Sequence, residues 1–188
     1  MCRELDEVLA YHCGPALLGL KAANLVSVAR EDVPDLEERI GGYQQLFAGR
    51  GIRFRLMCEC GRRALLLVYR RDLLQTQLAH PLAQELLRRD GYPLDGGLGE
   101  LLDHLARRLA GQREFPHEIG LFLGYPPEDV EGFQVHRGRE CKLCGHWKVY
   151  SDVERAQALF RRYDQCRDAL CRRLARGVTL SQLFRSVS

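Results

Sequence analysis

Two neighbouring segments, residues 52–58 and 64–69, constrain the fold more than any other part of the chain. The first places Ile, Phe, Leu and Cys on one side and arginines on the other, the pattern of a strand with one buried face. The second, Ala-Leu-Leu-Leu-Val-Tyr, is apolar throughout, as in a central strand covered on both faces. The turn sequence Cys60-Gly61-Arg62 lies between them, so the pair is predicted to form a β-hairpin.

Most of the remaining chain shows helical spacing of its apolar residues. Two more short strands are expected, at 24–29 and 147–150, and strands and helices do not alternate as in a doubly wound sheet. We therefore predict an α+β fold, a small mixed β-sheet of about four strands packed against several helices, in a single globular domain over residues 1–188. The expected helices are 3–11, 15–20 (opened by Pro15 after a break at Gly14), 32–47, 71–87 (with a break at His80-Pro81 left open), 96–109, 116–123, 127–133, 152–175 and a short one after Thr179.

Composition and charge exclude several classes of protein. A chain of 188 residues buries enough surface to fold without a disulfide or a metal ion. It contains no apolar run long enough to cross a membrane, and its acidic N-terminus does not resemble a signal peptide, so a cytoplasmic protein is expected. The net charge is only +3, and the arginines are interleaved with acidic residues, which argues against nucleic acid as a partner.

The sequence His12-Cys13-Gly14-Pro15 is the first candidate for chemistry. If Pro15 opens a helix, Cys13 lies at its N-terminus, where the helix dipole favours a thiolate, and Lys21 adds positive charge. The alternative is an apolar cysteine buried where the helix packs. The chain has eight cysteines, which in a reducing compartment are thiols, metal ligands or redox groups rather than disulfides.

The pair His117-Glu118 is the second candidate. Pro116 precedes it at a predicted helix start, so the two side chains are either a general acid/base or ligand pair, or a device that compensates the helix dipole. The dipole explains Glu118 better than it explains His117. The second histidine of a helical zinc-protease motif is lacking, so that chemistry is not expected.

Residues 141–150 hold the remaining candidates. Cys141, Cys144 and His146 have the spacing of ligands for zinc or iron, although the second cysteine pair of a strong zinc signature is lacking. In the strand that follows, Lys148 and Tyr150 share one face, which is either part of a site or exposed to water.

These motifs together resemble an uncharacterised family, a domain of unknown function found mainly in anaerobic bacteria, clostridia and sulfate reducers among them. The resemblance implies binding roles for His12, Lys21, Asn24, Arg70, Lys148 and Tyr150, and a link to iron or redox physiology with a partner such as flavodoxin. The matching residues are His12, Cys13, Pro15, Leu17, Lys21, Asn24-Leu25, Leu66 to Arg70, Phe115 to Pro126, Asp129 to Phe133 and Gly145 to Tyr150.

Three functions remain open at this point. The first is a small thiol-dependent, redox- or iron-linked enzyme, with Cys13, His117 and Glu118 catalytic and the two lysines at 21 and 148 holding a small anionic ligand. The second is a non-catalytic module that binds a metal, zinc or iron, or another ligand. The third is an interaction adaptor whose motifs are structural. The first requires the fold to bring Cys13 and His117, far apart in sequence, to one site.

Overall fold

The fold is built on a small antiparallel sheet, described in a computed structural model that covers residues 3–60, 62–111 and 115–185. Strand β3 lies between β1 and β2, and both pairings are antiparallel. The predicted hairpin and the central position of its apolar second strand are confirmed, as is the helix-rich α+β class. The three strands are β1 (Ala23–Ala29), β2 (Ile52–Cys60) and β3 (Arg63–Arg70).

The sheet differs from the prediction of one mixed sheet of about four strands. The segment expected as a fourth strand pairs instead in a separate two-stranded hairpin, β4 (Leu143–Cys144) with β5 (Lys148–Val149). The physical reason is burial: Trp147 and Val149 pack with a long helix near the C-terminus in a hydrophobic cluster of their own, away from the central sheet.

One face of the sheet is covered by helices from the first part of the chain. The core on this side joins aliphatic side chains such as Leu9 and Leu66 to three aromatic rings, those of Tyr43, Phe47 and Phe54. The covering elements are α1 (Arg3–Leu17), α2 (Leu36–Phe47) and the one-turn 3-10 helix η1 (Ala48–Arg50).

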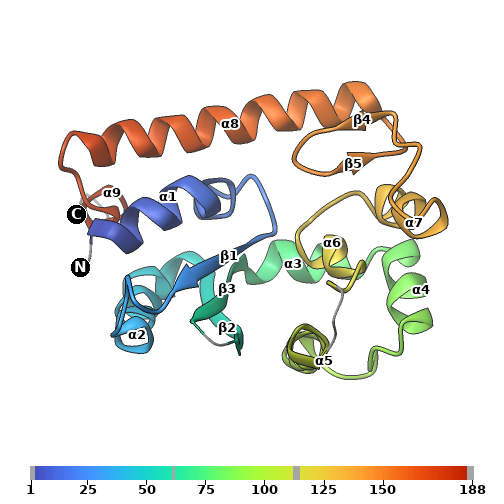
Figure 1. Cartoon of the computed structure of the whole chain (residues 1–188), viewed down its shortest axis with the longest axis horizontal. Helices are drawn as coiled ribbons and strands as arrows, with labels where there is room; N and C mark the ends of the chain where they lie inside the picture. The colour runs from blue at the N-terminus through green and yellow to red at the C-terminus, as the bar shows by residue number, and fades with distance from the viewer. Residues whose placement is uncertain (1–2, 61, 112–114, 186–188) are drawn as a thin grey trace.

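The other face is covered by the middle of the chain, which in Figure 1 lies on the right below the long helix. Leu67, Leu74 and Phe122 are fully buried in this second core. The break left open at His80-Pro81 is present, because His80 is extended and Pro81 begins a new helix. The helices of this part are α3 (Arg71–Leu78), α4 (Pro81–Arg89), α5 (Leu98–Gly111), α6 (Ile119–Phe122) and α7 (Pro127–Val135).

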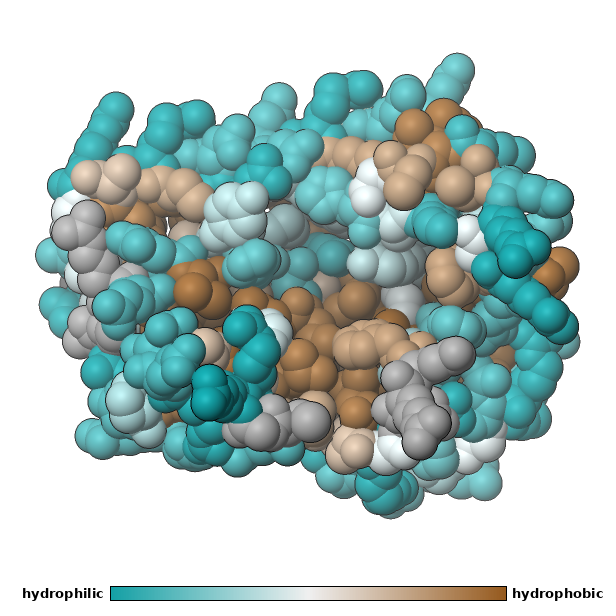
Figure 2. Space-filling model, in the orientation of Figure 1, coloured by the Kyte–Doolittle hydropathy of each residue, from teal (hydrophilic) through white to brown (hydrophobic). Residues whose placement is uncertain are grey.

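A long helix, α8 (Val153–Ala175), joins the two halves of the molecule. In Figure 1 it runs along the top, above α1 on the left and above the β4–β5 hairpin on the right. Leu170 and Leu174 pack into the first core, whereas Tyr163 belongs to the cluster around the hairpin. Figure 2 shows mostly hydrophilic side chains along the outer edge of α8. Hydrophobic side chains gather near the centre of the molecular face in view. Within the described part of the chain, no helix has the length and apolarity that crossing a membrane requires.

The carboxylate of Asp6 in α1 connects both ends of the described chain. It accepts a hydrogen bond from the hydroxyl of Tyr43 in α2 and another, at 3.0 Å, from the backbone N–H of Leu180. Leu180 begins α9 (Leu180–Leu183), the short helix expected after Thr179, and Thr179 and Gln182 form a capping box at its start. Asp6 is 2% exposed, so these bonds are made in the interior.

The prediction that Gly14-Pro15 breaks the first helix was wrong. Helix α1 continues through Pro15 to Leu17. The reason is tertiary packing: a Cβ added at Gly14 would lie 3.2 Å from Leu170 Cδ1 and 3.5 Å from the backbone of Arg167, so the glycine is where α1 and α8 approach closely. Gly14 is thus a contact point between two helices, and packing around it outweighs the backbone hydrogen bond that Pro15 cannot donate.

Candidate functional site

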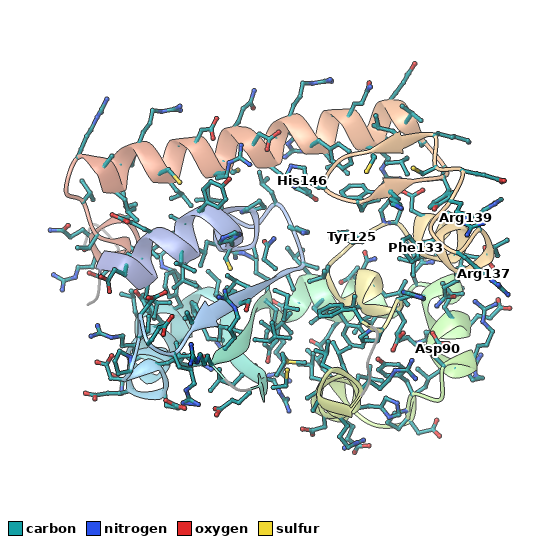
Figure 3. The ribbon with its side chains drawn as sticks, viewed as in Figure 1. Asp90, Tyr125, Phe133, Arg137, Arg139 and His146 are labelled. Carbon is teal, nitrogen blue, oxygen red and sulfur yellow. The ribbon has the colours of Figure 1, made fainter. Side chains whose placement is uncertain are left out.

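A pocket of about 320 Å³ lies between the α6–α7 region and the β4–β5 hairpin. Its walls include the rings of Tyr125, Phe133, Phe115 and Trp147. In Figure 3, Tyr125 lies between α6 and the hairpin, Phe133 lies on α7, and His146 lies at the tip of the hairpin beneath α8. Three separate segments of the chain therefore contribute to one aromatic pocket.

The position of the hairpin is fixed by the buried carboxylate of Asp129 in the first turn of α7. Its Oδ2 accepts from Trp147 Nε1 at 2.7 Å. Its Oδ1 accepts from the backbone N–H groups of Tyr150 and Ser151 and from Ser151 Oγ, each at 2.8 Å. Gly132 lets the hairpin approach, since a Cβ there would lie 2.6 Å from Tyr150. Asp129 lines the pocket, but its two oxygens are engaged in holding the pocket wall.

His117 and Glu118 point in opposite directions. Glu118 is 1% exposed, its Oε1 lies 2.5 Å from Arg108 Nε of α5, and it accepts a 2.8 Å hydrogen bond from the Tyr92 hydroxyl. His117 is exposed, lines the pocket and packs against Phe133 with 5.0 Å between ring centroids. The inward ion pair of Glu118 thus anchors the start of α6 and leaves the imidazole of His117 at the mouth of the pocket.

Lys148 and His146 add two more nitrogen groups to the same pocket. Lys148 Nζ donates to the carbonyl of Gly138 at 2.6 Å and lies 5.8 Å from the centroid of the Phe133 ring. His146 Nε2 lies 3.2 Å from Asp164 Oδ1 of α8. An ammonium has three hydrogens, so Lys148 keeps donors for a ligand. The pocket therefore combines aromatic walls with basic groups at its rim.

A second, smaller pocket of about 150 Å³ lies between α1, the start of β1 and α8. Its lining includes four residues that the sequence singled out: His12, Lys21, Asn24 and His146. The structure thus divides the predicted site residues: His117 and Lys148 share the larger pocket, His12 and Lys21 share the smaller one, and His146 lines both.

Cys13 lines neither pocket and is fully buried in the first core. Because α1 continues through Pro15, Cys13 is in the body of the helix and receives none of the stabilisation predicted at a helix N-terminus. Burial raises the pKa of Cys13 to about 12, although the charge of Lys21 opposes that rise. The direction is opposite to the activation that the sequence predicted.

Asn24, Arg70 and Tyr150 have structural contacts. Asn24 Oδ1 accepts from the backbone N–H of Ala16, and Arg70 donates to the carbonyls of Ala16 and Leu17, so both hold the last turn of α1. Tyr150 stacks on His136 with ring centroids 5.5 Å apart, and its buried hydroxyl has no hydrogen-bond partner within the described ranges.

The three predicted metal ligands do not converge. Over residues 3–60, 62–111 and 115–185, no group of three or more His, Cys, Asp and Glu side chains is placed to hold an ion. Cys144 is exposed, Cys141 is half-buried, and the imidazole of His146 turns to Asp164 on α8. A site for zinc or iron at these residues stays a prediction without geometric support.

The pocket residues that were not singled out from the sequence include Tyr125, Phe133, Tyr163 and Arg167. Tyr125 and Phe133, which line the larger pocket, lie within the motifs that match the family. The sequence therefore indicated this region but not the role of these two side chains. Tyr163 and Arg167 lie four positions apart on α8, one turn of a helix, which places them on one face. This spacing was the available signal.

The fold and the pockets define a helix-rich α+β protein with an aromatic cavity beside a small basic one. A family model described as protein of unknown function (DUF3793) matches residues 9–184. The chain belongs to this family. Comparison with curated proteins and with solved structures found no match.

Proposed function

We propose that the protein is a non-catalytic ligand-binding module whose larger pocket takes a small aromatic molecule with an anionic group. The observation that carries the proposal is the convergence of His117 and Lys148 on one pocket walled by aromatic rings. Ligand sites in proteins are concave and mostly apolar, with a few polar groups that orient the ligand.

The size and chemistry of the pocket support an aromatic ligand. A volume of about 320 Å³ is within the range of small-molecule sites. The Trp147 indole is stacked on Tyr125, with centroids 5.1 Å apart and 24° between the planes, and is fixed through its N–H by Asp129, so this wall is preorganised. Flat side chains held in this way offer faces on which a planar ligand stacks.

The charges at the rim support an anionic group on that ligand. Lys148 supplies an amino group, and His117 and His146 supply imidazoles to the same lining. Asp129 is the acidic residue of the lining, and its oxygens are already occupied by donors of the hairpin. An anion therefore meets donors rather than a free carboxylate.

The position of Cys13 favours this function over a thiol-dependent enzyme. A nucleophilic cysteine needs access and a lowered pKa. Cys13 is fully buried, and burial raises its pKa to about 12. Glu118 is likewise paired with Arg108 in the interior, away from the pocket lining, so neither group is positioned to act on a molecule bound there.

The proposal is tested with two probes that differ by one charge: 1-anilinonaphthalene-8-sulfonate and its neutral analogue N-phenyl-1-naphthylamine. The chain has one tryptophan, and Trp147 lines the pocket, so energy transfer from Trp147 to either probe reports occupancy. We expect Phe133→Ala to weaken both probes about tenfold, and Lys148→Gln to weaken only the sulfonate, also about tenfold.

The matched control is Val135→Ala on the same helix, α7, because Val135 is 67% exposed and does not line this pocket. It is expected to leave both affinities unchanged. Equal binding of the probes by wild-type protein and all three variants would refute the proposal. Circular dichroism of each variant checks that α7 and the hairpin remain folded.

A further inference from the structure

Lys21 is a buried cation without an anionic partner. Its side chain is 6% exposed, at the point where α1 gives way to β1. Among the residues that the structure describes, no carboxylate forms an ion pair with it. Burying a charge is costly unless it is paired, so a lysine in this position requires either compensation or a ligand.

The groups packed around Lys21 compensate its charge only in part. Its Nζ lies 5.1 Å from the centroid of Tyr125 and 5.7 Å from that of Tyr163, which are cation–π contacts. The nearby thiol of Cys13 stays protonated, because burial raises its pKa to about 12. Burial also lowers the pKa of Lys21 to about 8, so the ammonium form still predominates at neutral pH.

Lys21 lines the smaller pocket, and the other polar groups of that lining are mainly hydrogen-bond donors. The oxygen of the Asn24 amide is taken by Ala16 N–H, which leaves its NH2 group to donate. Arg167 also lines the pocket and is held by Asp164 and Asp168 at 3.1 and 3.3 Å. His12 and His146 contribute two imidazoles to the lining.

We propose that this pocket binds a single tetrahedral oxyanion of the phosphate class, with Lys21 as its central ligand. The volume of about 150 Å³ accommodates one such group and leaves little room for a larger anion. The shared chemistry is an oxyanion with several acceptor oxygens, either free phosphate or sulfate, or the terminal phosphoryl group of a larger molecule. This site is separate from the aromatic pocket and does not depend on the function proposed for it.

The test is calorimetric titration of the full chain with inorganic phosphate, at ionic strength held constant with chloride. We expect Lys21→Met to lose at least tenfold in affinity, since methionine keeps most of the length of the side chain and removes its charge. The matched control is Arg161→Met on the exposed side of α8, which removes the same charge and lines neither pocket. It is expected to keep the affinity of the wild type. Arg167→Met provides a second pocket variant if Lys21→Met does not fold.

Three further titrations define the ligand. Sulfate is expected to compete with phosphate, and acetate at the same concentration is not. Phenyl phosphate binding as tightly as phosphate identifies a terminal phosphoryl group, and its exclusion identifies the free anion; both results support the site. The proposal is overturned if wild-type protein shows no binding up to about 10 mM phosphate. It is also overturned if acetate binds equally well, or if Arg161→Met weakens binding as much as Lys21→Met.

Discussion

At the scale of single residues, Lys21 and Cys13 form a buried pair in which the pKa of each group is shifted in favour of its own neutral form. Burial lowers the pKa of Lys21 to about 8 and raises that of Cys13 to about 12. Each charge attracts the other, but desolvation is the larger cause for both groups. At neutral pH the pair therefore exists as an ammonium beside a neutral thiol.

The first prediction concerns the reactivity of the cysteines. In folded protein at about pH 8, iodoacetamide is expected to modify the exposed Cys144 long before Cys13, since only the thiolate reacts and Cys13 is both protonated and inaccessible. Mass spectrometry of peptides after timed quenching measures the order. Labelling in denaturant, where the two thiols become equivalent, is the control; modification of Cys13 first in folded protein would restore the enzyme hypothesis.

The second prediction concerns the stability of Lys21→Met as a function of pH, in buffer without phosphate. The folded-state pKa of Lys21 is about 8, below the ordinary value of 10.5. Below pH 8 the lysine is charged in both states and the folded state carries the full cost of burial, so Lys21→Met is expected to be more stable than wild type by about 3 kcal/mol.

Above pH 8 the folded wild type releases the proton while the unfolded chain keeps it, so this difference shrinks and vanishes toward pH 10.5. Urea denaturation of both proteins between about pH 6.5 and 9.5 measures the trend. The contribution of Cys13 is present in both proteins and largely cancels. A difference that stays constant over this range would show that Lys21 titrates normally.

At the scale of elements, Asp129 is the joint between α7 and the β4–β5 hairpin. Replacement by alanine leaves Trp147 Nε1 and the backbone N–H groups of Tyr150 and Ser151 without their acceptor. We expect a loss of about 3 kcal/mol or more in the free energy of unfolding. The fluorescence of Trp147 is also expected to shift to the red as the hairpin separates from α7.

The control for Asp129→Ala is Asp152→Ala, which removes only the N-cap of α8, a 2.9 Å bond from Arg155 N–H. That change is expected to cost about 1 kcal/mol and to leave the emission of Trp147 in place. Equal losses in the free energy of unfolding from the two substitutions would mean that Asp129 contributes no more to stability than the N-cap residue Asp152 does.

Most elements could be predicted from the sequence because the period of the apolar residues records which face is buried. The hairpin of β2 and β3, the helix α8 and the cap at Thr179 follow from this local pattern. The continuation of α1 through Pro15 could not be predicted, because it depends on Gly14 meeting Leu170, far away in sequence. The separate β4–β5 hairpin has a similar cause, the packing of Trp147 on Phe160 of α8.

The candidate site was predictable in parts. His117 and Lys148 both lie in the specific stretch 115–150, which is why the sequence singled them out. In the structure they line the same pocket. Cys13 was expected to be an activated thiol because of a helix start at Pro15 that the fold does not contain. The paired state of Glu118 could not be foreseen, because Arg108 and Tyr92 reach it from other elements.

At the scale of the whole molecule, the two pockets are adjacent and share His146. If both bind anions, the two ligands compete for one imidazole and repel each other, so each weakens the binding of the other by the same factor. We expect saturating phosphate to weaken the sulfonate probe by about twofold to fivefold and to leave the neutral probe unaffected. Titration of each probe with and without phosphate measures this.

His146→Ala is expected to reduce the coupling, because the shared group is removed while both sets of walls remain. Phosphate that weakens both probes equally would point instead to a change in the fold. Phosphate without effect on the sulfonate would mean that the two pockets act independently.

The hydrogen bond from Leu180 to Asp6 has a consequence for how the protein is made. A ribosome releases the N-terminal part of a chain first, yet one of the two hydrogen bonds that the Asp6 carboxylate accepts comes from Leu180, 174 positions later. The core that receives α1 is likewise completed by Leu170 and Leu174, which are synthesised long after α1. A nascent chain stalled before residue 170 thus contains the sheet on which α1 packs but lacks the contacts that α8 and Leu180 add. During synthesis, α1 emerges long before α8 and α9, so it is among the elements that complete their native contacts late.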